Sequence, residues 1–136
     1  LAGFDLSPRM VEKARARGVY DMLWVGELVD SMLSRPDAFD LVLAADVLVY
    51  VGDLCPVMVA AERTLRPGGR FAFTCERSQG DGFELHEGRR FAHGEAHIRE
   101  AVRAAGLTLA HLAHHSTRID RGDPVPGWIA LAVKGA

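Results

Sequence analysis

Strand-like and helix-like segments alternate along almost the whole sequence, and this alternation is the feature that most constrains the fold. The continuous apolar run at 39–45 is typical of a strand buried on both faces. Alternation of strands and helices indicates a mostly parallel sheet covered by helices on both faces. The 136 residues have room for one domain and one core. We therefore expect a single α/β domain.

Local start and stop signals predict the individual elements. Ser7 is a good helix N-cap, Pro8 suits the first helical position, and Gly18 is the expected left-handed stop. The expected strands are 1–5, 22–25, 39–45, 70–76, 107–115 and 128–133, and the expected helices are 8–17, 28–34, 53–65 and 94–105. We expect the last two strands to pair antiparallel. The polar, glycine-rich stretch 78–93 is expected to be a mobile loop.

Composition and charge exclude several classes of partner. Hydrophobic residues make up 49% of the chain and the formal net charge is −2, which gives no general attraction to nucleic acid or to an anionic membrane. No apolar run approaches the roughly 20 residues that a membrane helix needs. The two cysteines, Cys55 and Cys75, cannot form a disulfide framework. We therefore expect a cytoplasmic protein with no nucleic-acid partner and no membrane partner.

The acid that ends the first expected strand is the strongest candidate for a binding residue. In open α/β sheets, ligands bind outside the carboxyl ends of the strands, and an acid at this position accepts hydrogen bonds from a ribose. An ionised carboxylate at Asp5 can accept two hydroxyls in a charge-assisted, bidentate way. A glycine-rich loop is expected about 20 residues before such an acid. We therefore expect residues outside this sequence to complete the binding site.

Three segments in this order resemble the signatures of class I S-adenosylmethionine-dependent methyltransferases. They are GFDLSPRMVEKARARG at 3–18, FDLVLAADVLVYVGDL at 39–54 and LRPGGRFAFTCE at 65–76. The chain particularly resembles the methyltransferase domains found behind tetratricopeptide repeats, which the segments 88–107 and 123–135 also fit. The resemblance implies a Rossmann-like sheet, mostly parallel with a C-terminal antiparallel strand pair. It also implies S-adenosyl-L-methionine as cofactor and methyl transfer to an unidentified small-molecule acceptor.

The resemblance further implies a strand that residues 1–136 do not contain. In this family the first strand and its glycine-rich loop hold the methionine end of the cofactor, and the strand lies between those at 1–5 and 39–45. Without it, the edges of two strands expose unpaired N–H and C=O groups. Each such buried group costs about 1–3 kcal/mol. We therefore expect 1–136 to be a single, partial domain, a fragment whose sheet an upstream segment or a partner chain completes.

The resemblance implies a set of cofactor contacts at the ends of three strands. They are Asp5, Leu6, Glu27, Leu28, Ala45, Asp46 and Val47. In this scheme Asp5 binds the ribose and Glu27 accepts a hydrogen from the adenine amino group, with Leu6 and Leu28 against the ring. The segment 45–47 borders the transferred methyl group. Other roles stay open: core packing for Leu6, a solvated loop position for Glu27, and capping of the next turn for Asp46.

No residue is compelling as a catalytic base, so the catalytic residues stay unknown. Methyl transfer needs mainly positioning and, for a weak nucleophile, a general base. His93 and Glu76 are the candidates, each with a surface or structural role as the alternative. Tyr50 is a candidate for cation–π contact with the sulfonium, with simple packing as the alternative. The pair 89–90, two arginines, is a candidate for binding an anionic substrate, with a solvated loop pair as the alternative.

Two rival functions stay open at this point. A nicotinamide-dependent dehydrogenase also places an acid after its second strand to bind the NAD ribose. The LRPGG turn and the closing antiparallel pair count against that reading. The absence of the glycine-rich loop favours a non-catalytic or regulatory domain. The six histidines lack zinc-ligand spacing, so we expect no metal site.

Overall fold

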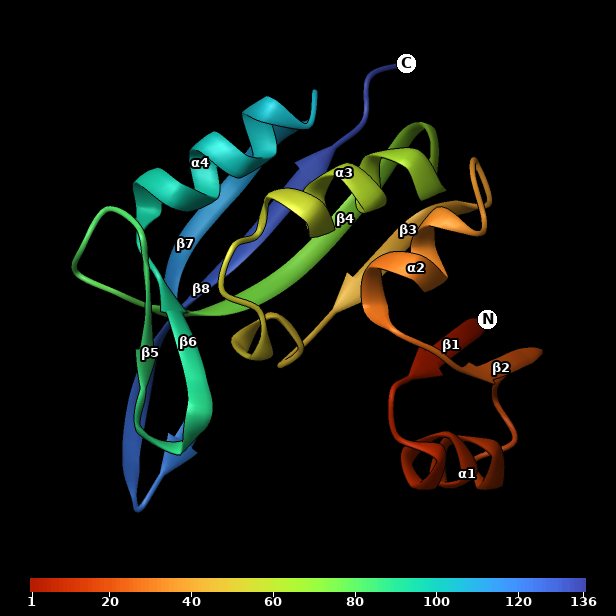
Figure 1. Ribbon diagram of the computed structural model, residues 1–136, viewed down its shortest axis with the longest axis horizontal. Coiled ribbons are helices and arrows are strands. Elements are labelled where there is room, and N and C mark those ends of the chain that lie inside the picture. The colour runs from red at the N-terminus through yellow and green to blue at the C-terminus, as the bar shows by residue number, and fades with distance from the viewer.

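The computed structural model describes all of residues 1–136, as two sheets with helices packed against them (Figure 1). The smaller sheet pairs β1 (Ala2–Asp5) with β2 (Met22–Val25) in parallel. The larger sheet has six strands, with the path β5-β6-β4-β8-β7 and with β3 paired to β4. Its strands are β3 (Phe39–Ala44), β4 (Leu65–Arg77), β5 (Phe83–His86), β6 (Arg90–His93), β7 (Thr108–Asp120) and β8 (Asp123–Val133). The expected α/β class is confirmed, but the expectation of a mostly parallel arrangement is wrong for these residues, because three strand pairings are parallel and three are antiparallel.

The first strand–helix–strand unit forms as its sequence signals predict. The Ser7 hydroxyl oxygen accepts a hydrogen bond from the Met10 N–H at 3.3 Å, and α1 (Pro8–Ala16) begins at the proline. Gly18, just after α1, has a φ of 67°, a conformation that a side chain would disfavour. The short α2 (Leu28–Leu33) follows β2 and confirms the predicted helical turn. Signals within a few residues of each boundary are therefore enough to predict this strand–helix–strand unit.

The hydrophobic core lies between the larger sheet and two helices, α3 (Cys55–Thr64) and α4 (Glu95–Ala104), which cover the same face of it (Figure 1). Nineteen buried side chains form one cluster there. Phe71 and Phe73 of β4 lie at its centre, with ring centroids 4.9 Å apart. Leu54 is the N-cap residue of α3, and the carboxylate of Asp53, one residue earlier, accepts a hydrogen bond from the Cys55 N–H at 3.0 Å. No helix is long and apolar enough to cross a membrane.

β3 is buried on one face only, and the prediction of a strand covered on both faces is wrong for these residues. Ala44 faces the core and is 4% exposed, whereas Leu41 and Leu43 are 59% and 70% exposed. β3 pairs with β4 along one edge, and no strand pairs with the other edge. The apolar run does form a strand, but no element of the chain packs over its second face.

The segment 78–93 is not a loop throughout, because it contains the β5–β6 hairpin. β5 and β6 pair antiparallel, and Gly88 turns the chain with a φ of 77°. β6 also pairs in parallel with the end of β4, placing Ala92 opposite Glu76. Glycines and charged residues in the segment concealed the short strands from sequence reasoning. The hairpin extends the sheet beyond the point where β3 stops pairing with β4.

The last two strands confirm the predicted antiparallel pair and are longer than expected. β7 pairs with β8 over almost its whole length, and β8 pairs antiparallel with β4. The strands continue past the end of β4 as a projecting hairpin, visible at the lower left of Figure 1. Beyond the end of β4, β7 and β8 continue to pair with each other, and this pairing makes both strands longer than predicted.

Candidate cofactor site

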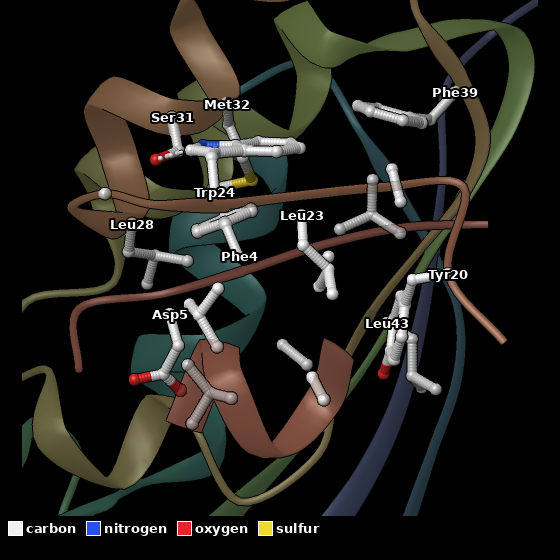
Figure 2. Close-up of a pocket in the computed structure, with 18 of the residues that line it drawn as sticks. Phe4, Asp5, Tyr20, Leu23, Trp24, Leu28, Ser31, Met32, Phe39 and Leu43 are labelled. Carbon is white, nitrogen blue, oxygen red and sulfur yellow. Dashed lines mark hydrogen bonds between the residues drawn. The ribbon is translucent and has the colours of Figure 1, made fainter. Parts of the chain in front are cut away.

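A mostly apolar cavity of about 530 Å³ lies between the two sheets (Figure 2). β1 and β2 line one side of it, through residues such as Phe4 and Leu23, and β3 lines the other through Phe39 and Leu43. Residues of α1 and α2 contribute to its walls as well. β1 and β3 both border this cavity, yet they do not pair. The cavity therefore separates two strands whose facing edges lack partners.

Asp5 lies at the carboxyl end of β1, on the border of this cavity (Figure 2). One carboxylate oxygen, Oδ1, accepts a hydrogen bond from the Ser7 N–H at 2.8 Å. The other oxygen accepts no hydrogen bond from the chain. Leu6 also lines the cavity and is 73% exposed. The end of β1 thus offers an open carboxylate oxygen beside an open apolar side chain.

Glu27 lies at the matching end of β2, but its carboxylate caps α2. Oε1 accepts a hydrogen bond from the Val29 N–H at 3.2 Å, and Oε2 accepts one from the Asp30 N–H at 3.0 Å. These backbone bonds, that from Asp30 above all, lower the pKa of Glu27. Leu28 lines the cavity whereas Glu27 does not. A contact between Glu27 and adenine therefore stays a prediction, with a local capping role now visible beside it.

The turn after β3 is held by two neighbouring strands. Val47 lines the cavity, whereas Ala45 and Asp46 do not. Asp46 has a φ of 56°, which is uncommon for a residue other than glycine. Its N–H donates to the Thr74 hydroxyl at 2.9 Å, and its Oδ1 accepts from Arg90 Nη2 at 2.5 Å. The structure thus brings Val47 to the cavity and ties Asp46 to β4 and β6.

His93 has a structural role in this chain. Its ring is fully buried, and Nε2 lies 2.8 Å from the Val51 carbonyl oxygen and 3.0 Å from that of Gly52. Because both neighbours only accept, Nε2 carries the proton, and Nδ1 is buried without a partner. Burial lowers the pKa of His93 against the opposing effect of the two carbonyls. A ring in this position joins β6 to 51–52, which matches the structural role considered as the alternative to catalysis.

Glu76, the other candidate base, is 4% exposed and paired with two arginines. Its Oε1 accepts from Arg90 Nε at 2.6 Å and from Arg118 Nε at 3.0 Å. Hydrogen bonds to Glu76 and Asp46 outweigh partial burial and raise the pKa of Arg90. An oxygen that accepts hydrogen bonds from two guanidiniums is poorly placed to take a substrate proton.

Tyr50 is 64% exposed, and its hydroxyl accepts a hydrogen bond from Arg90 Nη1 at 3.3 Å.

Sequence reasoning named Arg90 only as half of a candidate anion-binding pair, and it missed both the contacts of Arg90 with Glu76 and Asp46 and the aromatic lining of the cavity. The side chain of Arg90 is 14% exposed and belongs to β6, whereas Arg89 is exposed in the hairpin turn as a solvated residue would be. Phe4 stacks on Trp24 with ring centroids 5.1 Å apart, and both line the cavity. The alternation of apolar and polar residues at 83–86 is the signal that could have indicated the hairpin and placed Arg90 on its second strand. No group of three or more His, Cys, Asp or Glu side chains is placed to hold a metal ion.

A comparison with protein families identifies the class of protein. Residues 1–73 match the family described as a methyltransferase domain. The match covers more than half of the 136 residues, so the chain belongs to this methyltransferase family. None of the curated protein sequences compared with the chain matches it.

Solved structures show which fold the chain shares. An S-adenosylmethionine-dependent methyltransferase from Methanosarcina mazei is similar over 98% of this chain and 81% of its own, with a TM-score of 0.74 and 15% identity. A complex of the Trm112 methyltransferase activator with a putative methyltransferase from Haloferax volcanii is similar over 99% and 72%, with a TM-score of 0.77 and 22% identity. A Burkholderia thailandensis 1,6-didemethyltoxoflavin-N1-methyltransferase, with its substrate and S-adenosylhomocysteine bound, is similar over 99% and 61%, with a TM-score of 0.75 and 20% identity. The fold is therefore that of class I S-adenosylmethionine-dependent methyltransferases.

Proposed function

We propose that this chain binds S-adenosyl-L-methionine and transfers its methyl group to a small-molecule acceptor. The observation that carries the proposal is the open carboxylate oxygen of Asp5 at the carboxyl end of β1, on the border of an apolar cavity. Family membership supports the same reading. The bound small molecule in the Burkholderia structure supports a small acceptor. The identity of that acceptor is a matter for substrate screening.

The cofactor contacts follow from the ends of the three strands. Asp5 accepts hydrogen bonds from the ribose hydroxyls, because one of its oxygens has no partner within the chain. Leu6 and Leu28 cover the adenine ring, since both are apolar and line the cavity. Val47, in the turn 45–47, borders the methyl group. S-adenosyl-L-methionine supplies a methyl group on a positively charged sulfur, which makes it reactive toward a nucleophile.

The residues of this chain contribute positioning more than proton transfer. His93 is buried against two carbonyls, and the bonded oxygen of Glu76 serves two guanidiniums. Holding the reactants in a productive geometry can itself supply a large share of a rate enhancement. In this proposal the acceptor nucleophile reacts without a base from residues 1–136.

We also propose that a strand from outside residues 1–136 pairs between the facing edges of β1 and β3 and fills that part of the cavity. The cofactor then binds at the rim of the cavity, where the carboxyl ends of the strands lie. An upstream segment of the protein or a partner chain supplies it, so that 1–136 form a single, partial domain. The unpaired facing edges support this, because exposed strand edges are templates for pairing. The exposed Leu41 and Leu43 on β3 support it as well. The Haloferax structure, in which a methyltransferase is held with an activator, keeps a partner chain as an alternative to test.

We place the enzyme in the cytoplasm. Cys55 and Cys75 are both free thiols. Proteins of reducing compartments keep their thiols in this form. Localisation of a tagged protein in its native cells tests this placement.

Calorimetric titration tests the cofactor and the rival functions together. The complete protein, meaning the natural protein with the segment that fills the cavity, is expected to bind S-adenosylhomocysteine and not NAD. Residues 1–136 alone should bind S-adenosylhomocysteine less tightly, because the cavity between β1 and β3 is open. Binding of NAD alone would overturn the proposal in favour of a dehydrogenase-type domain. Binding of neither ligand by the complete protein would favour a non-catalytic domain.

A further inference from the structure

Arg90 connects the cofactor side of the molecule to the β5–β6 hairpin, and we infer that it is a positioning residue for methyl transfer. The inference rests on the proposed function. It assigns to Arg90 an action through Asp46, in the turn after β3, without contact to the cofactor itself.

The donor groups of Arg90 reach three different elements. Nε donates to Glu76 Oε1 at the end of β4, and Nη2 donates to Asp46 Oδ1 after β3. Nη1 donates to the hydroxyl of Tyr50, which belongs to the short 3₁₀ helix η1 (Leu48–Tyr50). The centroid of the Tyr50 ring lies 5.5 Å from the guanidinium carbon of Arg90. The planar guanidinium presents donors in a fixed fork, whereas a lysine ammonium is a single point charge. Arginine is therefore suited to hold these elements together.

The contact with Glu76 is the fixed end of this arrangement. Glu76 is 4% exposed, and a second guanidinium, that of Arg118, shares its Oε1. The Arg90 side chain is 14% exposed, while that of Asp46 is 53% exposed. Breaking a buried pair by removing one partner is strongly unfavourable, so the buried end resists displacement. The exposed Asp46 is the end that Arg90 restrains.

The restraint matters because Asp46 determines where the turn lies. Its backbone is in the left-handed region, and its N–H is held by Thr74. Val47, the next residue, lines the cavity. A shift of Asp46 therefore moves Val47 and the adjacent peptide groups relative to the proposed methyl position. Arg90 also belongs to β6, so the same contacts connect the position of the hairpin to that of the turn.

A double-mutant cycle in the complete protein tests this role, with S-adenosylhomocysteine as the calorimetric probe. Arg90→Met is expected to weaken binding by about fivefold or more, the usual lower range for coupling between sites. Asp46→Asn should also weaken the binding of S-adenosylhomocysteine. The double variant should bind no more weakly than whichever single variant binds more weakly. Arg90→Lys should not restore the affinity, because one ammonium cannot replace the fork. Arg99→Met is the control, since it removes an exposed ion pair with Glu95 on α4.

The outcomes separate this inference from the function on which it rests. If the unmodified protein fails to bind S-adenosylhomocysteine, the proposed function is overturned. If it binds and Arg90→Met binds equally well, or if the two single losses add, Arg90 is not a positioning residue. If the role of Arg90 were purely structural, Arg90→Met would lower the midpoint of thermal unfolding. It would not change the affinity for S-adenosylhomocysteine measured at a temperature well below that midpoint. Should Arg90→Met fail to fold, Arg90→Lys and Asp46→Asn provide the same comparison.

Discussion

The two sheets of this molecule differ in how completely residues 1–136 pair their strand edges and bury their side chains. In the larger sheet β4 has partners along both edges, and Phe71 and Phe73 are 0% and 2% exposed. In the smaller sheet no residue of β1 or β2 is buried, and Val25 is 50% exposed. The candidate cofactor residues gather at the open side. The comparison indicates that the larger sheet carries most of the stability. We propose that the open side between the sheets carries binding and that an added strand completes it.

The largest expected difference between the two sheets is in the free energy of unfolding. Phe71→Ala should destabilise residues 1–136 by about 3–5 kcal/mol, the usual cost of removing a buried phenylalanine. Phe4→Ala should cost less than half as much, because Phe4 is only partly buried and lines the open cavity. Urea denaturation followed by circular dichroism gives both values. Equal losses would show that the smaller sheet is as well closed as the larger one.

Cofactor affinity should depend on the end of β1. Asp5→Ala in the complete protein is expected to weaken S-adenosylhomocysteine binding by roughly 1.5–3 kcal/mol, the range for hydrogen bonds to a charged group. Asp81→Ala is the matched control, because Asp81 is an exposed acid outside the cavity. Calorimetry compares the two variants. An unchanged affinity in Asp5→Ala would remove this residue from the site.

The free energy of unfolding should also depend on pH in mild acid, because of His93 in β6 of the larger sheet. Burial holds the pKa of His93 below its ordinary value of about 6.5, with His97 and Glu76 as its charged or titratable neighbours. The unfolded chain then binds more protons than the folded chain just below pH 6.5. The free energy of unfolding should therefore fall as the pH drops from 7.5 to about 5.5.

Variants at two histidines separate this effect from others. His93→Gln should flatten the dependence of stability on pH in that range, because the buried titrating ring is gone. His111→Gln, at an exposed position on β7, should leave it unchanged. Denaturation curves at several pH values give the slopes. A slope that persists in His93→Gln would assign the effect to another group.

The smallest effect is expected on the uncovered face of β3. Leu43→Thr should change the stability of residues 1–136 by no more than about 0.5 kcal/mol, because Leu43 is 70% exposed. The same substitution should cost more in the complete protein, where we propose that the added segment covers this face. Denaturation of both forms provides the comparison. An equal effect in the two forms would argue against a covering segment.

Elements with local signals were predictable, and those that depend on distant contacts were not. The Ser7 cap and the Gly18 stop placed α1 correctly, because both act within a few residues. The β5–β6 hairpin was missed because its pairing with β4 compensates for glycines and charges in its own sequence. The partners of Arg90 were missed for a similar reason, since Asp46 and Glu76 lie 44 and 14 residues away along the chain. Side-chain partners so distant leave no periodic signal.

The candidate site was predictable to a comparable extent. Asp5, Leu6, Leu28 and Val47 come together around one cavity, as their positions at strand ends suggested. The capping role of Glu27 was missed although the helix start was expected at Leu28, where α2 does begin, because a glutamate directly before a helix was considered only as a ligand contact or a solvated residue. The bond between Asp46 and Arg90 required knowledge of a hairpin that the sequence did not reveal.

Hydrogen exchange of the complete protein, with and without S-adenosylhomocysteine, tests the central claim most directly. The claim is that an adenosyl cofactor binds at the carboxyl ends of β1 and β3, beside a strand that fills the cavity. The account predicts that the ligand slows amide exchange in 1–7 and 42–51 and leaves the tip of the β7–β8 hairpin unchanged. Slower exchange at that hairpin alone, with none at 1–7, would contradict it.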